Sequence, residues 1–398
     1  MEEKMKTITV ENGVTLLTRN VENILFESMW KMPNGVTLNS YIVRGEETAV
    51  IDGFCGWDGY PESLFKLLKE CDVKLESIKH VVVNHVEPDH SGWLKDFKKI
   101  HSDFTIYCTR EAKSLLEMYY GEFKNIVAVK NGEELDLGGR VLEFIKTPNV
   151  HWPDTMMTFD RESGTLFSCD CFGEFGILEN HLDSEHKPKE LDAREEDRIR
   201  YYSNILGLFS MNVSKAISQI KNYDVKIIAP GHGIIYKENT EYIIDKYEKY
   251  ASYQRAADVK NALIIWGSMY GVSEATIPVI EKELKKKGYH VDSVNAESTD
   301  IGTLLMKAWS AGTLVIISPT YEMALFPPVA AAVDELCRKK LQVRELMFFG
   351  SCGWSGGALR ELKQIIERYR IKWEMKAEYE FKGAVTKEVE EKIKSLIS

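Results

Sequence analysis

The C-terminal part of the chain alternates short apolar runs with amphipathic stretches. The apolar runs have the length and composition of buried strands, and they cover residues 261–267, 289–294, 313–318, 345–350 and 376–379. The stretches that follow them show helical spacing of apolar residues, at 274–287, 303–308, 328–339, 358–369 and 387–396. Strands that alternate with helices in this way predict a parallel, doubly wound sheet with right-handed crossovers.

The N-terminal part has a different pattern, in which apolar runs end beside histidines and aspartates. Strand-like runs at 141–145, 165–169 and 225–229 are each followed closely by such a residue. A polar helical stretch at 241–255 separates the two parts. Because 398 residues exceed one ordinary core, we predict two domains, residues 1–256 and residues 257–398.

Composition and charge narrow the class of protein. A hydrophobic fraction of 44% with 28% charged residues is typical of a soluble globular protein, and no apolar run is long enough for a membrane span. The N-terminus lacks the apolar core of a signal peptide. A net charge of −10 argues against nucleic acid as the main partner. Seven cysteines without zinc-finger spacing indicate a reducing, cytoplasmic setting.

The most informative stretch is Val83-Asn84-His85-Val86-Glu87-Pro88-Asp89-His90. Residues two apart in an extended segment point the same way, so His85, Glu87 and Asp89 can face one spot. Carboxylates and imidazoles gathered this closely are costly to hold unless a cation offsets their repulsion. The stretch therefore predicts a metal site.

Three later residues complete the predicted ligand set, each where a strand meets a loop: His151, Asp170 and His232. Any one of these histidines alone would be read as an ordinary loop or core histidine. The combined pattern favours metal binding. Oxygen donors mixed with imidazoles suit iron or manganese better than an imidazole-richer set would, without excluding zinc. Cys169 and Cys171 flank Asp170, but a continuing strand would point them away from it, so we expect buried, inert thiols.

The H-x-E-x-D-H run, followed by His, Asp and His, resembles the metallo-β-lactamase fold, an αββα sandwich with metals at one edge. Zinc hydrolases of that superfamily usually have His at the position of Glu87, whereas the form with Glu is found in flavodiiron proteins. The resemblance implies that His85, Glu87 and His151 bind one iron. It further implies that Asp89, His90 and His232 bind the other, with Asp170 bridging, although the counterpart of His90 is not bound to metal in every family member.

Three loops at the strand ends of the C-terminal domain resemble the FMN-binding loops of flavodoxins. Backbone N–H groups at a helix start, with serine hydroxyls, suit a phosphate, and a tryptophan among glycines suits a flat ring. Each loop alone is read as an ordinary turn between a strand and a helix. The residues expected to contact FMN are Ser268, Met269, Tyr270, Gly271, Val272, Ser273, Pro319, Thr320, Tyr321, Glu322, Ser351, Cys352, Gly353, Trp354, Ser355 and Gly356.

A metallo-β-lactamase-like domain followed by a flavodoxin-like domain is the architecture of flavodiiron proteins. The resemblance implies FMN, two non-haem irons per chain, and reduction of O2 to water, of NO to N2O, or of both. It also implies a head-to-tail homodimer, or a dimer of dimers. The sequence holds no C-x-x-C pair, so electrons are expected from rubredoxin or a similar small carrier. Tyr201 or Tyr202 is a candidate hydrogen-bond donor to bound gas, with helix packing as the alternative.

Two other functions stay open at this point. One is a zinc-dependent hydrolase of the metallo-β-lactamase superfamily with a flavodoxin appendage, against which Glu87 argues. The other is a diiron and flavin gas sensor, against which the lack of a recognisable output module argues. The identity of the bound metal, iron or zinc, distinguishes a flavodiiron reductase from the hydrolase. Steady consumption of O2 or NO distinguishes a reductase from the sensor.

Overall fold

The computed structural model describes residues 5–55 and 61–397, and it divides into two compact units. The units are Met1–Glu248 and Lys249–Ser398, so the division falls within helix α8 (Thr240–Arg255). The domain boundary that we predict at 256/257 lies just beyond the end of the same helix.

The core of unit 1 lies between the apolar faces of two β-sheets. In the described residues, the larger sheet has the order β1-β2-β5-β6-β7-β8-β9 and the smaller sheet the order β10-β11-β12-β13-β14. The core between them includes Tyr41 and Phe167, whose ring centroids are 5.0 Å apart. The strands of the larger sheet are β1 (Met5–Glu11), β2 (Val14–Val21), β5 (Val36–Arg44), β6 (Thr48–Ile51), β7 (His80–Val82), β8 (Thr105–Cys108) and β9 (Asn125–Ala128).

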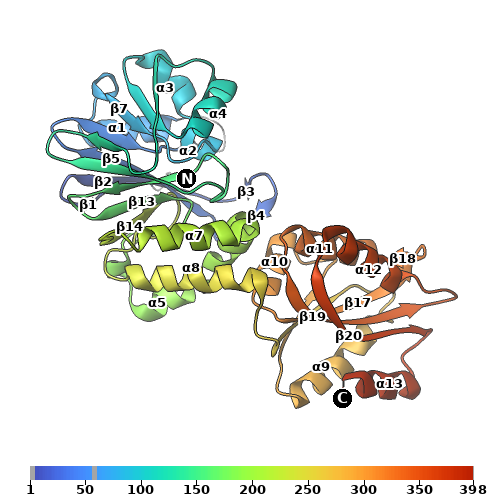
Figure 1. The fold of residues 1–398 in the computed structure, drawn as a ribbon. Helices are drawn as coiled ribbons and strands as arrows, with labels where there is room; N and C mark the ends of the chain where they lie inside the picture. The colour runs from blue at the N-terminus through green and yellow to red at the C-terminus, as the bar shows by residue number, and fades with distance from the viewer. Residues whose placement is uncertain (1–4, 56–60, 398) are drawn as a thin grey trace. The chain divides into compact units, whose positions relative to one another are not determined.

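Helices cover both outer faces of this pair of sheets, which gives the predicted αββα sandwich (Figure 1). The strands of the smaller sheet are β10 (Glu134–Asp136), β11 (Val141–Lys146), β12 (Met156–Asp160), β13 (Thr165–Cys169) and β14 (Ile227–Pro230). The helices of this unit are α1 (Glu62–Glu70), α2 (Pro88–Ser91), α3 (Leu94–Ile100), α4 (Arg110–Tyr120), α5 (Pro188–Ala193), α6 (Glu195–Tyr201), α7 (Ser210–Ile220) and the first part of α8.

Unit 2 is the predicted doubly wound parallel sheet, with the order β16-β15-β17-β19-β20. Every neighbouring pair along this path is parallel, and the short β18 (Ala324–Leu325) pairs antiparallel with β17. The sequence did not predict β18, because two residues give no periodic signal. The strands are β15 (Asn261–Trp266), β16 (His290–Asn295), β17 (Thr313–Tyr321), β19 (Val343–Cys352) and β20 (Lys372–Lys382).

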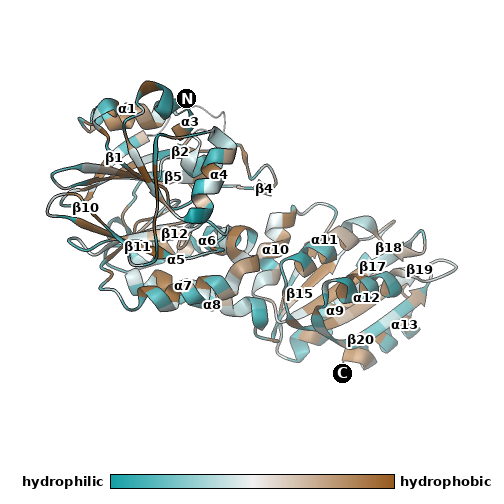
Figure 2. Ribbon diagram, turned by 45° about the horizontal axis from the view of Figure 1, so that its top comes forward, coloured by the Kyte–Doolittle hydropathy of each residue, from teal (hydrophilic) through white to brown (hydrophobic). Residues whose placement is uncertain are grey.

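The burial of unit 2 explains why its elements could be recognised from sequence. Seven consecutive residues of β17 are buried, as expected for a central strand covered on both faces. Helix α12 buries Ala358, Leu362 and Ile365, which lie on one helical face. Figure 2 shows hydrophobic residues along the strands and hydrophilic ones on the outer helix faces. The helices are α9 (Ile277–Lys286), α10 (Ile301–Trp309), α11 (Pro327–Arg338), α12 (Ala358–Tyr369) and α13 (Lys387–Ile397).

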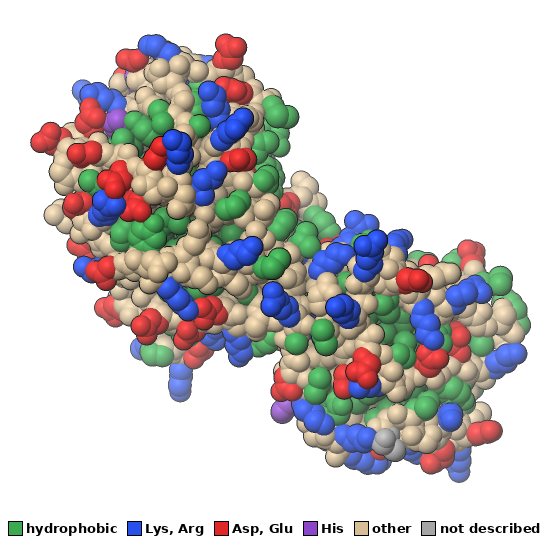
Figure 3. All heavy atoms as spheres, viewed as in Figure 1, with side chains coloured by type: hydrophobic (Ala, Val, Ile, Leu, Met, Phe, Trp, Pro, Cys, Tyr) green, Lys and Arg blue, Asp and Glu red, His purple; other side chains and the backbone are tan. Residues whose placement is uncertain are grey.

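The surface carries both signs of charge. Figure 3 shows acidic and basic side chains interspersed over the face in view. Within residues 5–55 and 61–397, no helix combines the length and the apolar character that crossing a bilayer requires.

Candidate metal centre

The structure brings all seven predicted ligands together at one edge of the sandwich in unit 1. The ligands form two groups, and within each group the ligand atoms all lie within 4.8 Å of one another. The first group is His85, Glu87, His151 and Asp170, and the second is Asp89, His90 and His232.

Asp170 connects the two groups, because its two carboxylate oxygens face different histidines. Oδ2 lies 3.5 Å from Nε2 of His85 and 3.4 Å from Nε2 of His151. Oδ1 lies 2.9 Å from Nε2 of His90 and 3.4 Å from Nε2 of His232. A carboxylate placed in this way can bridge two cations.

The local backbone explains how one short motif serves both groups. Residues 83–87 form a loop after β7, and Pro88 starts the short helix α2 at its first position. This helical turn places Asp89 beside His232, with Oδ2 of Asp89 3.3 Å from Nε2 of His232. The expectation that His85, Glu87 and Asp89 face one spot is therefore correct only for the first two, because the extended segment ends at Pro88.

Burial and missing partners show that the cluster fits cations. His85, Asp170 and His232 have exposed fractions of 0 to 1%. Among the described residues, no hydrogen bond reaches His85 Nε2, His232 Nε2, Asp170 Oδ2 or either carboxylate oxygen of Asp89. Buried polar atoms are rarely left without partners, and these converge on one another, so bound cations would satisfy them.

The pKa values of the cluster reflect the same crowding. Burial acts to lower the pKa of His151, but the nearby carboxylates of Asp170 and Glu87 raise it to about 9. Burial likewise opposes the charge on His232, while Asp170 and Asp89 raise its pKa to about 10. Burial would raise the pKa of Glu87, yet His151 and His85 lower it to about 2. The metal-free cluster therefore holds protons where cations would sit.

A second layer of residues orients the histidines. Oδ2 of Asp154 lies 3.1 Å from Nδ1 of His85 and accepts a hydrogen bond from the Val86 N–H at 2.8 Å. The carbonyl oxygen of Thr37 lies 3.1 Å from Nδ1 of His232. Both contacts leave the Nε2 atoms pointing into the cluster, as second-layer partners of metal ligands do. We did not predict Asp154 or Thr37, because their histidine partners are distant in the sequence.

The two candidate tyrosines have different surroundings. The Tyr201 hydroxyl donates to Oδ1 and to the carbonyl oxygen of Asp170, each at 3.2 Å. The Tyr202 hydroxyl instead donates to Ser210 Oγ at 2.9 Å. Helix α6 ends at Tyr201 and a π-helical segment, Tyr202–Leu206, follows it. Such segments often mark functional positions, and here the change separates a tyrosine at the cluster from one that packs away from it.

Cys169 is closer to the cluster than the sequence predicted. Its Sγ lies within 4.8 Å of ligand atoms of His90 and Asp170. The expectation that Cys169 points away from Asp170 was wrong, because Cys169 has a φ of 50° and the extended strand conformation ends there. Burial and the nearby carboxylates of Asp52 and Asp170 raise the pKa of its thiol well above the usual value. Cys171 is buried and belongs to no such group among the described residues.

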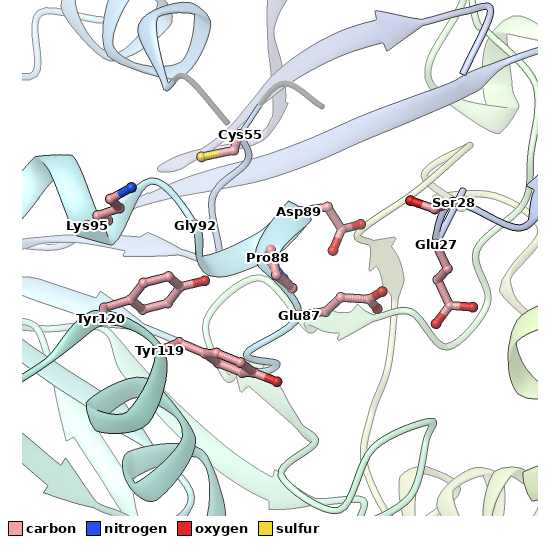
Figure 4. Close-up of a pocket in the computed structure, with 10 residues that line it drawn as sticks. All are labelled: Glu27, Ser28, Cys55, Glu87, Pro88, Asp89, Gly92, Lys95, Tyr119 and Tyr120. Carbon is pink, nitrogen blue, oxygen red and sulfur yellow. The ribbon is translucent and has the colours of Figure 1, made fainter. Parts of the chain in front are cut away.

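A cavity of about 440 Å³ leads to the cluster from the surface (Figure 4). The carboxylates of Glu87 and Asp89 face it, and the side chain of Glu27 enters from the opposite side. Glu27 lies in the hairpin between β3 (Leu25–Phe26) and β4 (Trp30–Lys31). The cavity is lined by Glu27, Ser28, Cys55, Glu87, Pro88, Asp89, Gly92, Lys95, Tyr119 and Tyr120.

The remaining histidines have ordinary surroundings where the structure describes them. Nε2 of His80 lies 2.7 Å from a Glu47 carboxylate oxygen, and Nε2 of His101 lies 3.2 Å from the carbonyl oxygen of Ile78. None of His80, His101, His181, His186 and His290 belongs to a possible metal group among those residues.

In unit 2, the predicted flavin residues lie at the carboxyl ends of β15, β17 and β19. The first loop follows β15 as predicted, whereas Pro319–Tyr321 and Ser351–Cys352 are the last residues of β17 and β19, because these two strands are longer than their apolar runs. A hydrogen bond of 2.8 Å between the hydroxyls of Ser273 and Ser351 joins the first loop to the third. Tyr270 is fully exposed and Trp354 is 88% exposed, so both rings are available to a ligand. Gly271, with a φ of 79°, has open space where a Cβ would be. These loops fit a flat, phosphorylated ring compound such as FMN.

Comparisons with known proteins agree with this arrangement. A family model described as ODP family beta lactamase matches residues 36–233. A nitric oxide reductase of Moorella thermoacetica is 30% identical over 344 residues, which are 85% of this chain and 83% of the relative. An anaerobic nitric oxide reductase flavorubredoxin of Vibrio vulnificus is 31% identical over 337 residues, and the match covers 83% of this chain and 66% of that longer protein.

Solved structures show the same fold along the whole chain. A variant of a flavo di-iron protein from Thermotoga maritima has a TM-score of 0.91 at 27% identity, covering 100% of this chain and 98% of its own. The rubredoxin oxygen:oxidoreductase of Desulfovibrio gigas has a TM-score of 0.91 at 24% identity, covering 98% and 97%, which shows a shared fold. With both domains, the metal cluster and this similarity in place, the chain belongs to the flavodiiron protein family.

Proposed function

We propose that this protein is a flavodiiron oxidoreductase that reduces O2 to water, NO to N2O, or both. The observation that carries the proposal is Asp170, whose two oxygens face two separate groups of histidines and carboxylates. Two cations bound side by side suit substrates made of two atoms, or of two molecules that must react with each other. Relatives of this chain bear the names of nitric oxide reductases and of a rubredoxin oxygen:oxidoreductase.

The residues that would hold the metals follow from the two groups. His85, Glu87 and His151 would hold one iron, and Asp89, His90 and His232 the other, with Asp170 shared between them. Two bound irons and the flavin would together supply the electrons that the reduction of the gas consumes. Three carboxylates offset part of the positive charge of two such ions, and hard oxygen donors mixed with imidazoles favour iron over a softer metal.

Neighbouring side chains hold the metal ligands in position and connect them to the wall of the cavity. Asp154 fixes the ring of His85, and the Tyr201 hydroxyl fixes Oδ1 of Asp170 by donating to it. The Tyr120 hydroxyl lies 3.0 Å from Ser91 Oγ, which donates to the carbonyl oxygen of Val86 at 2.6 Å. This chain of contacts ties one wall of the cavity to the ligand loop. The position of the ligands is thereby set before substrate enters.

In unit 2 the first loop would bind the FMN phosphate and the other two the ring system. The loop hydroxyl of Ser273 is buried and held by Ser351, whereas the Trp354 ring lies open at the surface. A ring that is this exposed gains burial when it stacks on a flavin.

We further propose that two copies associate head to tail, so that the flavin of one faces the metals of the other. Met29 and Tyr119 are exposed near the entrance to the metal cluster, and Tyr270, Met323 and Trp354 are exposed around the flavin loops. Exposed apolar side chains gathered around functional openings are typical of surfaces that a partner covers. A small redox carrier of the rubredoxin type would supply the electrons. All seven cysteines are free, which supports a reducing compartment such as the cytoplasm.

Metal and flavin analysis combined with gas consumption tests this function. Freshly purified protein should contain two irons and one FMN per chain, and it should consume O2 or NO steadily with a reduced carrier. Two zincs with hydrolytic activity would instead support a metallo-hydrolase. Stoichiometric gas binding without turnover would support a sensor. Paired rates with the two gases under one electron donor measure the preference between them.

A further inference from the structure

The thiol of Cys169 lies inside the metal cluster, although Cys169 is not one of the seven proposed iron ligands. Its Sγ and ligand atoms of His90 and Asp170 all lie within 4.8 Å of one another, and all three side chains are buried. The backbone of Cys169 is held in place, because the Gly231 N–H donates to its carbonyl oxygen at 2.6 Å. Gly231 immediately precedes His232, so the position of the thiol is tied to the loop that carries this ligand.

A sulfur donor changes which cations the cluster accepts. Thiolate, imidazole and carboxylate together are a common ligand set for zinc, whereas hard oxygen donors with imidazoles suit iron. We propose that His90, Cys169 and Asp170 form a second metal-binding arrangement within this pocket, which takes a thiophilic divalent cation of the Zn²⁺ or Cd²⁺ class.

The binding step exchanges two protons for the cation. The S–H bond of Cys169 breaks and the proton between Nε2 of His90 and Oδ1 of Asp170 is displaced. Both protons leave to solvent, and the electron pairs on sulfur, nitrogen and oxygen form the bonds to the cation. No electron is transferred, so the step needs no oxidant or reductant. Nε2 of His90 and Oδ1 of Asp170, which lie 2.9 Å apart, would turn from each other to the cation.

The new arrangement and the iron arrangement exclude each other, because His90 and Asp170 belong to both. A thiophilic ion held by Cys169 would remove the bridging carboxylate from its position between two irons. The pocket would then be occupied, and the protein could not turn over its substrate. This consequence rests on the proposed function, whereas cation binding by the three residues does not.

Cysteine variants of the metal-free protein test the arrangement directly. Cd²⁺ added to metal-free protein that retains FMN should produce an ultraviolet difference band from sulfur-to-cadmium charge transfer. The band should saturate at an equimolar amount of Cd²⁺. Cys169→Ser should lose it. Cys171→Ser is the matched control, because Cys171 is also buried, lies two positions away and belongs to no metal group among the described residues, so it should keep the band.

Two further measurements do not depend on the folding of one variant. Cadmium-113 NMR of the wild-type protein should place the bound ion in the range of sulfur-ligated sites. Loading with a mixture of Fe²⁺ and Zn²⁺ should give an iron-to-zinc ratio roughly tenfold higher in Cys169→Ala than in the wild type.

The proposal is overturned if Cys169→Ser keeps the full band, or if the NMR shift lies in the range of nitrogen and oxygen ligands alone. It is also overturned if Cys171→Ser abolishes the band while Cys169→Ser does not. Failure of the proposed function is a separate result. A protein that binds Cd²⁺ through Cys169 but contains no iron when purified would refute the reductase and support this inference.

Discussion

Asp154 orients His85 through the ring nitrogen that faces away from the metal cluster. Oδ2 of the fully buried Asp154 carboxylate lies 3.1 Å from this nitrogen, Nδ1 of His85. The same oxygen accepts the N–H of Val86. Burial would raise the pKa of Asp154, but the adjacent His85 lowers it below its usual value. The carboxylate is therefore charged, and it fixes both the tautomer and the direction of the ring that points into the cluster.

Asp154→Asn should weaken iron binding by about 10- to 100-fold, because an amide holds the imidazole without a charge. The loss should appear in iron titrations of the metal-free protein. Asp160→Asn is the matched control, since Asp160 is as buried as Asp154 and lies in β12 outside both ligand groups. Equal iron affinities for wild type and Asp154→Asn would show that the carboxylate is not needed to orient His85.

Tyr201→Phe should reduce turnover several-fold, whereas Tyr202→Phe should leave turnover unchanged. Both rings are buried in successive positions, but only the Tyr201 hydroxyl reaches Asp170. Each change removes a buried hydroxyl that donates a hydrogen bond, so both should cost about 1 kcal/mol of unfolding free energy. Comparison of kcat with denaturant unfolding separates the two effects. A drop in kcat shared by both variants would contradict a particular role for Tyr201.

The metal-free protein should lose stability at alkaline pH more than the metal-loaded protein does. The folded-state pKa values of His151 and His232 are about 9 and about 10, above the ordinary value of 6.5. Groups with raised pKa contribute stability that is fully present below the unfolded value and lost as pH rises through the folded value. The melting temperature of metal-free protein should therefore fall between about pH 7 and about pH 10.

Bound metal replaces these protons, so the loaded protein should lack this particular decline. His232→Gln should reduce the decline in the metal-free protein, because one of the two groups with raised pKa is gone. A metal-free melting temperature that stays constant over this range would show that the imidazoles are not stabilised as cations.

The sequence predicted the layers of the fold and the members of the metal cluster for physical reasons. A strand such as β17 is buried on both faces, so its apolar run is continuous and easily recognised. The ligand motif is local, and each later ligand follows a buried strand. Strand ends from both sheets that meet at one edge of the sandwich then bring distant ligands together.

Other features of the site depend on backbone turns that residue patterns do not reveal. Cys169 takes a left-handed φ of 50°, which breaks the alternation on which its predicted direction rested. Glu27 and Ser28 have φ values of 49° and 57°, although neither is glycine, and their hairpin carries them to the cavity. The pairing of Asp154 with His85 spans 69 positions and follows only from the tertiary fold.

Trp354→Ala should weaken FMN retention while iron content stays at the wild-type level. The ring is 88% exposed, so its removal costs little folding energy, but it takes away the proposed stacking surface. Trp354→Phe should keep much of the affinity. Fluorescence titration of flavin-free protein measures the dissociation constant of FMN, and metal analysis measures iron. Unchanged FMN affinity in Trp354→Ala would remove this residue from the flavin site.

Mixing a variant without a working metal site and a variant freed of its weakly held FMN tests whether the flavin of one copy serves the metals of another. Asp170→Asn should lose iron chemistry and keep FMN, because the shared carboxylate is gone, while Trp354→Ala should keep iron. In a head-to-tail dimer, a mixed pair has one junction with an intact flavin and intact metals. Random reassociation of equal amounts should restore roughly a quarter of the wild-type activity. Electron transfer within a single chain would give no recovery of activity in the mixture. Asp170→Asn alone, taken through the same reassociation, provides the baseline.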